Sequence, residues 1–310
     1  MTSPAKTGPL RAGVIGAGVF GAYHAAQWAK TAGVKMAGVL DPHPERAGAL
    51  TARFGGEAFG DLAAFLAHVD VVSVCSPAVT HGACALSALR AGKAVYVEKP
   101  IATDPADADA IVGEAARRGL VAACGFLERA TFAAMGLFDA PEAPLRLEAR
   151  RFGAPSPRNF DVSVVIDLMI HDLDLALTLT GAAPLTVEAE GVCEANALFD
   201  RAEAEITFDD GFIAVLSASR TAKVKARTVR LVYPSGEVII DVLNRTFSNT
   251  TAFALNPAFA QTPAGGDPLG ASLEAFLAAV RGGRAKPLAD AADGARALDL
   301  ALAVEQAVGG

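Results

Sequence analysis

The chain has 310 residues, of which 52% are hydrophobic and 20% are charged, and its formal net charge is −7. This length favours two domains, and the composition is too apolar for a disordered protein. The negative charge and the lack of a basic cluster argue against a nucleic-acid partner, because neutralisation of phosphates dominates that affinity. An anionic small molecule needs only local positive charge and is not excluded.

Three features of the sequence predict the cellular location of the protein. Residues 1–10 lack the apolar stretch of a secretory signal, and polar residues interrupt every apolar run before the roughly 18 residues that span a bilayer. The four cysteines form no CxxC pair and have no histidines at metal-ligand spacing, which predicts reduced thiols. We expect a cytoplasmic protein without a membrane anchor or a bound metal.

In the first part of the chain, short apolar runs alternate with longer amphipathic runs. This alternation predicts successive βα units, a parallel sheet and hence an α/β fold. The expected strands are Leu10–Ile15, Val34–Leu40, Val69–Cys75, Ala94–Val97 and Leu120–Cys124. The expected helices include His81–Ala91 and Pro105–Arg118. We expect a doubly wound domain over residues 1–125.

A glycine-rich turn joins the first expected strand to the helix that follows. Gly16, Gly18 and Gly21 form a GxGxxG pattern, with Val19 and Phe20 between the last two glycines. Gly16 permits a tight turn, Gly18 lets backbone approach a pyrophosphate, and Gly21 allows the helix to pack closely on the strand. The pattern arises easily by chance in a glycine-rich chain, so its place between a strand and a helix carries the prediction of a dinucleotide site.

The second expected strand ends at Asp41, which follows Gly21 by 20 residues. This is the spacing of an acid that accepts the ribose hydroxyls of the adenosine half of a dinucleotide. The alternative is that Asp41 caps the next helix. A carboxylate here repels a ribose 2′-phosphate and favours NAD over NADP, although Arg46 lies close enough in sequence to meet such a phosphate. We expect NAD as the cofactor.

Two loops with polar residues follow later strands of the same sheet. Ser76, Pro77 and His81 come after the strand that ends at Cys75, and Glu98 and Lys99 come after Ala94–Val97. Ligands of open α/β sheets bind at the carboxyl ends of strands, so we expect both loops to line the cofactor crevice. A lysine placed there can take a hydroxyl proton while hydride leaves carbon. The alternative for Lys99 is a surface lysine.

The pattern changes after about Gly125, which predicts a second α/β domain over residues 126–310 with a mainly antiparallel sheet. A helix is expected at Ala130–Phe138, and two turns, Asp209–Gly211 and Pro234–Glu237, each predict a hairpin. The hairpin strands are Arg201–Phe208 with Phe212–Arg220, and Thr228–Tyr233 with Val238–Leu243. Helices at Leu269–Val280 and Ala291–Val308 close the chain and could pack back on the first domain.

A further group of polar side chains precedes these strands. Asp167 and His171 are four residues apart, so on a helix they share a face and the carboxylate could orient the imidazole. Asp174 lies on that face too. The alternative is therefore the solvated stripe of an amphipathic helix.

Four segments together resemble the Gfo/Idh/MocA oxidoreductases: residues 13–24, SPAVTH at 76–81, EKP at 98–100 and DLMIHDLD at 167–174. The resemblance continues to residues 267–283 and covers nearly the whole chain. It implies a Rossmann domain followed by an α/β domain whose open, largely antiparallel sheet often mediates oligomerisation, as a homodimer or homotetramer. It also implies Lys99, Asp167 and His171 as the catalytic set.

Within this family, residues 125–135 and 157–175 resemble the branch that oxidises UDP-N-acetylhexosamines at the sugar 3-hydroxyl. The chain departs from that branch at residues 130–132, Ala-Thr-Phe, where its members usually carry Phe-Asn-Pro. Arg129, Arg158 and Arg151 could meet a diphosphate or carboxylate, because Arg suits bidentate anion recognition. They could equally be surface charges.

We therefore expect NAD-dependent hydride transfer from a secondary alcohol of a sugar, a polyol or a sugar nucleotide. Lys99 or His171 would accept the hydroxyl proton, and Asp167 would support the imidazole. Two alternatives stay open: a non-catalytic NAD(P)-binding sensor of the same fold, and a reductase of a carbonyl or imine. The presence of three candidate proton-transfer groups favours an enzyme over a sensor.

Overall fold

The computed structural model describes residues 8–154, 161–194, 197–282 and 285–309. The chain forms two compact units. The first comprises Met1–Gly125 with Leu269–Ala295, and the second comprises Phe126–Pro268 with Arg296–Gly310. Among the helices in the described ranges, none is long and apolar enough to cross a membrane.

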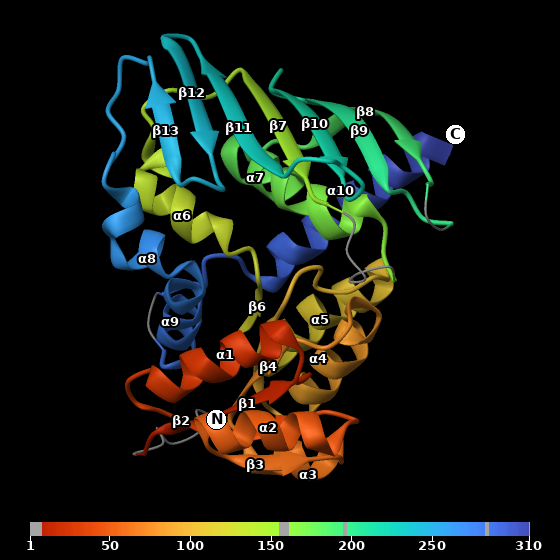
Figure 1. Cartoon of the computed structure of the whole chain (residues 1–310), viewed down its shortest axis with the longest axis vertical. Coiled ribbons are helices and arrows are strands. Elements are labelled where there is room, and N and C mark those ends of the chain that lie inside the picture. Colours follow the sequence, from red (N-terminus) through yellow and green to blue (C-terminus); the bar gives the residue numbers. More distant parts are fainter. Residues whose placement is uncertain (1–7, 155–160, 195–196, 283–284, 310) are drawn as a thin grey trace. The chain divides into compact units, whose positions relative to one another are not determined.

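The first unit is built on a six-stranded parallel sheet with the order β3-β2-β1-β4-β5-β6 (Figure 1). Its strands are β1 (Leu10–Ile15), β2 (Val34–Leu40), β3 (Glu57–Phe59), β4 (Val71–Val74), β5 (Ala94–Val97) and β6 (Ala122–Cys124). The chain starts at β1, runs outward to β3 and then returns to β4 on the other side of β1. This reversal is the switch point at which doubly wound sheets bind ligands.

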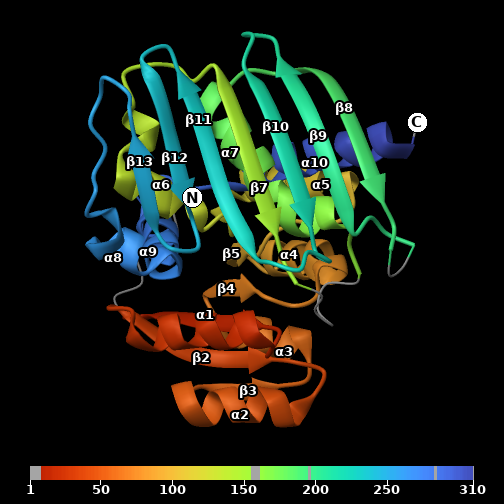
Figure 2. The same cartoon turned by 45° about the horizontal axis from the view of Figure 1, so that its top comes forward.

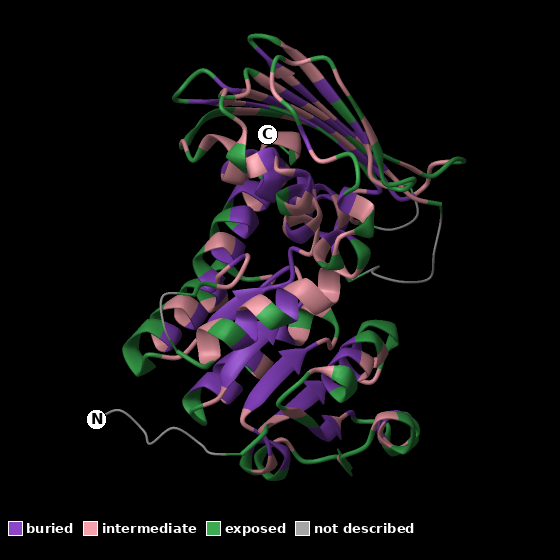
Figure 3. Ribbon diagram, turned by 90° about the vertical axis from the view of Figure 1, so that its left-hand side faces the viewer, coloured by how far each residue is buried: buried purple, intermediate pink, exposed green. Residues whose placement is uncertain are grey.

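Helices connect these parallel strands. They are α1 (Val19–Lys30), α2 (Pro44–Phe54), α3 (Leu62–His68), α4 (His81–Arg90) and α5 (Pro105–Arg118), and α9 (Pro268–Val280) joins them from far along the chain. The four residues of β4 and the four of β5 are all buried, and Figure 3 shows this sheet mostly in the buried colour. Strands covered on both faces read as continuous apolar runs, which is why the sequence predicted them well.

The second unit contains a seven-stranded sheet with the order β13-β12-β11-β7-β10-β9-β8. Its strands are β7 (Arg146–Phe152), β8 (Pro184–Val192), β9 (Arg201–Phe208), β10 (Ile213–Ser219), β11 (Ala226–Tyr233), β12 (Gly236–Asp241) and β13 (Thr246–Asn249). The two predicted hairpins are confirmed as β9–β10 and β11–β12. The sheet is not a simple meander, however, because β7 lies between β10 and β11 and runs parallel to β10.

One face of this sheet is covered by helices and the other is open (Figure 2). The covering helices are α6 (Glu128–Met135), α7 (Ile170–Thr180) and the part of α10 (Ala291–Gly309) that follows Ala295. Burial alternates along β9, where Ala202, Ala204, Ile206 and Phe208 point inward. A half-covered antiparallel sheet produces this alternation.

Two helical segments differ from the sequence prediction. Helix α6 begins two residues before the predicted start and ends at Met135, before the predicted end at Phe138. The next residue, Gly136, has a φ of 82°, in the left-handed region that closes helices. The helix with Asp167 and His171 is irregular, because Val165–Met169 form a π-helical turn and α7 begins only at Ile170. Such π turns often occur at functional sites.

Candidate active site

The glycine turn between β1 and α1 has the geometry that the sequence pattern predicts. Gly16 has a φ of 95°, and a Cβ at this residue would lie 2.7 Å from the Cys75 backbone. A Cβ on Gly21 would collide with the Gly16 carbonyl oxygen, whereas a Cβ on Gly18 would have nothing within 4 Å. Two glycines therefore shape the turn, and the third leaves space for a ligand to approach the backbone.

The first turn of α1 presents apolar side chains beside this space. Val19 is 43% exposed and Phe20 is 45% exposed. Exposed apolar side chains at a helix N-terminus suit a dinucleotide, which offers both a pyrophosphate and apolar ring faces.

Asp41 braces the glycine turn directly. Its Oδ2 accepts a hydrogen bond from the Ala17 amide at 2.7 Å, and its Oδ1 accepts one from the His43 amide at 2.9 Å. The second bond goes to His43, the residue before α2, and not to an amide of the first turn of that helix, so Asp41 is not the helix cap of the alternative interpretation. A carboxylate offers about four lone-pair positions, so each oxygen can accept a further bond from a ribose hydroxyl. Arg46 lies exposed on the first turn of α2.

The loops that follow β4 and β5 are joined by a histidine. The ring of His81 is buried, with Nε2 2.8 Å from the Ser76 carbonyl oxygen and Nδ1 2.6 Å from the Pro100 carbonyl oxygen. The Thr80 hydroxyl lies 2.7 Å from both Ser76 Oγ and the Pro77 carbonyl oxygen. The two loops that the sequence assigned to the cofactor crevice are thus held together by one side chain.

Glu98 lies in the interior of the unit. Its Oε1 is 2.8 Å from Nε2 of His24, and Nδ1 of that imidazole is 2.9 Å from Ser73 Oγ. The Trp28 indole also donates to Ser73 Oγ at 2.9 Å. His24 had no role predicted from the sequence. The available signal was its position on the buried face of α1, where a polar residue needs a polar partner.

The buried Glu98 charge influences its neighbours. Burial and the Glu98 carboxylate raise the pKa of the Cys75 thiol and of the Tyr96 hydroxyl well above their usual values. Tyr96 is also hydrogen-bonded to Ser272 at 2.9 Å. These two groups therefore stay neutral. Lys99, which follows Glu98, is half-buried and joined to Pro100 by a cis peptide bond.

In the second unit, a buried arginine joins α6 to α7. The Arg151 guanidinium binds Glu128 through two bonds of 2.8 and 2.7 Å and Asp172 through two bonds of 3.0 and 2.7 Å. Burial raises the pKa of Asp172 against the effect of Arg151. Burial also opposes ionisation of Glu128, but Arg151 lowers the pKa of Glu128 to about 2. The pKa values of two carboxyl groups that share one cation move apart, because the two groups interact strongly.

A second arginine of α6 is paired with α7 as well. Arg129 binds Asp174 through bonds of 2.9 and 2.6 Å, and both side chains are at most 10% exposed. Asp167, Asp172 and Asp174 are all buried, so this helix does not present a solvated stripe. Arg129 and Arg151 are likewise not surface charges. The predicted contact Arg158 lies outside the described residues.

His171 lies at the start of α7 and is half-buried. Its ring makes an edge contact with Phe126 at 6.1 Å between centroids. The charge of His171 is one of the smaller causes that lower the pKa of Glu128. Asp167 belongs to the preceding π-helical turn, so the two residues are not related by regular α-helical spacing as the sequence suggested.

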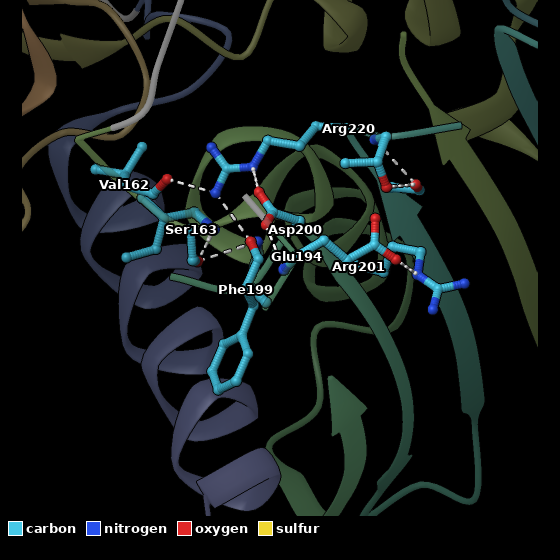
Figure 4. A network of polar contacts seen from close by, with 11 residues as sticks. Val162, Ser163, Glu194, Phe199, Asp200, Arg201 and Arg220 are labelled. Atoms are coloured by element: carbon cyan, nitrogen blue, oxygen red, sulfur yellow. Dashed lines mark hydrogen bonds and ion pairs between the residues drawn. The ribbon is translucent and has the colours of Figure 1, made fainter. Parts of the chain in front are cut away.

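A buried ion pair fixes the start of this irregular helix (Figure 4). Arg220 Nε lies 3.0 Å from Asp200 Oδ1, and Arg220 Nη2 donates to the carbonyl oxygens of Val162 and Phe199 at 2.9 Å each. Ser163 Oγ accepts bonds from the first amides of the helix. Arg220 follows β10, so the end of the sheet holds the segment that leads to Asp167.

The fold and the glycine turn define a nicotinamide-dependent oxidoreductase. Residues 10–126 match the model of the oxidoreductase family with an NAD-binding Rossmann fold, and residues 144–239 match the GFO/IDH/MocA C-terminal domain. The chain belongs to the Gfo/Idh/MocA family of oxidoreductases, as the sequence motifs indicated, and its cofactor is NAD.

Individual members of the family are similar over most of the chain. A UDP-N-acetylglucosamine 3-dehydrogenase from Acidithiobacillus ferrooxidans is 41% identical over 72% of this chain and 71% of its own length. The solved structure of that enzyme covers 97% of this chain and 98% of its own, with 39% identity and a TM-score of 0.88. A scyllo-inositol 2-dehydrogenase (NAD(+)) from Bacillus subtilis is 29% identical over 64% of each chain.

Proposed function

We propose that this protein oxidises the 3-hydroxyl of a UDP-N-acetylhexosamine and transfers the hydride to NAD. The observation that carries the substrate class is the 41% identity to a UDP-N-acetylglucosamine 3-dehydrogenase. A more distant structure of the same fold, the WlbA dehydrogenase from Bordetella pertussis in complex with NADH and UDP-GlcNAcA, has 18% identity and a TM-score of 0.87 and supports the fold alone.

The glycine turn and Asp41 would hold the dinucleotide. Gly18, Val19 and Phe20 border the open space beside the turn, and Asp41 would accept the ribose hydroxyls while it braces the Ala17 amide. Gly16, Gly21 and the loops with Ser76, Pro77, His81 and Glu98 shape the rest of the site. Bound NAD supplies the hydride acceptor.

Three side chains would handle the substrate proton. Lys99 or His171 accepts the proton of the hydroxyl as hydride leaves the same carbon, and Asp167 supports the imidazole. The position of Lys99, two residues after the end of β5 at the carboxyl edge of the parallel sheet, supports this role. Arg129 and Arg158 remain our proposed contacts for the diphosphate.

The substrate proposal is tested by incubating the purified protein with NAD and, separately, UDP-N-acetylglucosamine, free hexoses and inositols. We expect the nicotinamide absorbance to rise with the sugar nucleotide, together with a product that is two hydrogens lighter. Turnover of inositol, without turnover of the sugar nucleotide, would contradict the proposed substrate class and indicate a polyol substrate. A preference for NADP over NAD would overturn the role given to Asp41.

We also propose that the protein works in the cytoplasm as a homodimer or homotetramer. All four cysteines are free thiols, as is usual in a reducing compartment. The open face of the seven-stranded sheet mixes apolar side chains with both signs of charge, which suits contact with a second copy of the same face.

A further inference from the structure

His81 is a buried side chain whose two ring nitrogens contact backbone carbonyls of different loops. The Ser76 oxygen is 2.8 Å from Nε2, and the Pro100 oxygen is 2.6 Å from Nδ1. His81 is only 2% exposed. Both distances are those of hydrogen bonds.

Carbonyl oxygens can only accept hydrogen bonds, and a neutral imidazole has only one N–H. With a neutral ring, one nitrogen lone pair of His81 would face a carbonyl lone pair at hydrogen-bond distance. Turning the ring over does not help, because carbon atoms would then replace both nitrogens at these positions. Only the imidazolium, with a proton on both nitrogens, satisfies both carbonyls.

The other buried histidine of this unit provides a contrast. His24 faces the Glu98 carboxylate on one side and the Ser73 hydroxyl on the other. Trp28 can only donate to Ser73 Oγ, which leaves the serine proton to be donated to Nδ1 of His24. A neutral ring protonated on Nε2 therefore satisfies all partners of His24, and this is not true of His81.

Charged and titratable residues lie near His81 in sequence or on the neighbouring helix. Lys99 and Glu98 precede Pro100, and the Glu98 carboxylate is turned toward His24. From α5, Asp107 packs against the backbone of Gly82, where an added methyl group would collide with its carboxylate. Cys84, which is on α4 with His81, stays a neutral thiol because burial raises its pKa. A carboxylate next to α4 is compatible with a cationic His81.

We propose that His81 is a positioning residue that carries a proton on both ring nitrogens and so fixes the loop of Ser76 to the loop of Lys99. The bridge itself follows from the structure, and its effect on hydride transfer rests on the proposed function. Loss of one proton leaves one buried carbonyl without its donor. We expect the loop of Lys99 to become less ordered when this happens.

The protonation state is measured directly by nitrogen NMR of the full-length protein labelled with ¹⁵N-histidine, with NAD bound. The chain has five histidines, and the His81→Gln variant identifies the signals of His81 by their loss. We expect both His81 nitrogens to show the shift of a protonated ring at neutral pH. A nitrogen of His81 with the shift of an unprotonated ring, in folded protein at that pH, would overturn the proposal.

A binding measurement tests the consequence without any substrate. Loss of one charge-assisted hydrogen bond in His81→Gln should weaken NAD binding by roughly tenfold, and the pH at which wild-type NAD binding weakens should match the pH at which the His81 signals change. The control is His68→Gln on α3, which removes a half-exposed histidine. Unchanged NAD affinity in a folded His81→Gln protein would overturn the positioning role. Failure of sugar-nucleotide turnover would instead affect only the proposed function.

Discussion

At the scale of single residues, the most consequential polar contacts of this protein are buried. Arg151 holds two carboxylates, Arg129 holds one, and Arg220 holds Asp200 and two carbonyl oxygens. An unpaired charge in the protein interior costs free energy. Each of these pairs therefore holds together the two elements that carry its partners. From the sequence, Arg129 and Arg151 were expected only as anion contacts or surface charges, and Arg220 had no predicted role.

The Glu128 carboxylate gives a pH-dependent prediction. Its pKa falls from 4.5 to about 2 on folding, so its contribution to stability is complete above pH 4.5 and is lost as the pH falls toward 2. Between pH 5 and pH 3 the wild type should lose about 2 kcal/mol more unfolding free energy than Glu128→Gln. Urea unfolding at both pH values measures this difference. Equal losses in the two proteins would show that Arg151 does not favour the Glu128 carboxylate.

At the scale of elements, strand ends and helix starts carry the candidate site. The carboxyl ends of β1, β2, β4 and β5 lead to the glycine turn, Asp41, Ser76 and Glu98. In the second unit, the residues after β10 hold the start of the π-helical turn through Arg220. The irregular helix thus receives its support from the sheet, and a change at Arg220 should reach Asp167 through the backbone.

The ion pair of Arg220 and Asp200 can be compared with an exposed pair beside it. Arg220→Ala leaves a buried Asp200 charge and should lower the unfolding free energy by about 3 kcal/mol or more. Arg201 pairs with Glu194 at the surface (Figure 4), and Arg201→Ala should cost less than about 1 kcal/mol. Denaturant unfolding of both variants measures the contrast. Similar, small losses would mean that the buried pair does not hold the helix start.

At the scale of the whole molecule, the sequence predicted the parallel sheet better than the second unit. Strands β1, β2 and β5 have the predicted bounds because each is a continuous apolar run between turn residues. The short edge strand β3, with two exposed residues of three, has no such signal. The insertion of β7 between β10 and β11 is a pairing of distant segments, which local patterns do not contain.

Some residues of the candidate site could be predicted from local motifs and others could not. Motifs identified the glycines, Asp41 and the loops with His81 and Lys99, because these residues have fixed spacings from strand ends. His24 and Arg220 carry no spacing signal, since their partners Glu98 and Asp200 are distant in sequence. The π-helical turn at Asp167 also escaped prediction, because helical periodicity assumes a uniform turn.

The open sheet face gives a prediction about assembly. Ile239 is 39% exposed and lies across from Arg230, which pairs with Glu148 and Glu237 on the same face. If this face joins two copies as proposed, Ile239→Glu should give a monomer, because the change would bury an unpaired carboxylate in the interface. Sedimentation velocity measures the change, with Val224→Glu in an exposed loop as control. A monomeric wild type would refute this use of the face.

The role of Lys99 is tested most directly by replacing it with methionine. With saturating NAD and UDP-N-acetylglucosamine, we predict that Lys99→Met lowers the rate of nicotinamide reduction by at least about 100-fold, while NAD binding stays within a few-fold of wild type. Lys35→Met, at an exposed lysine of β2, should leave the rate unchanged. Turnover by Lys99→Met within about tenfold of wild type would show that another group takes the proton.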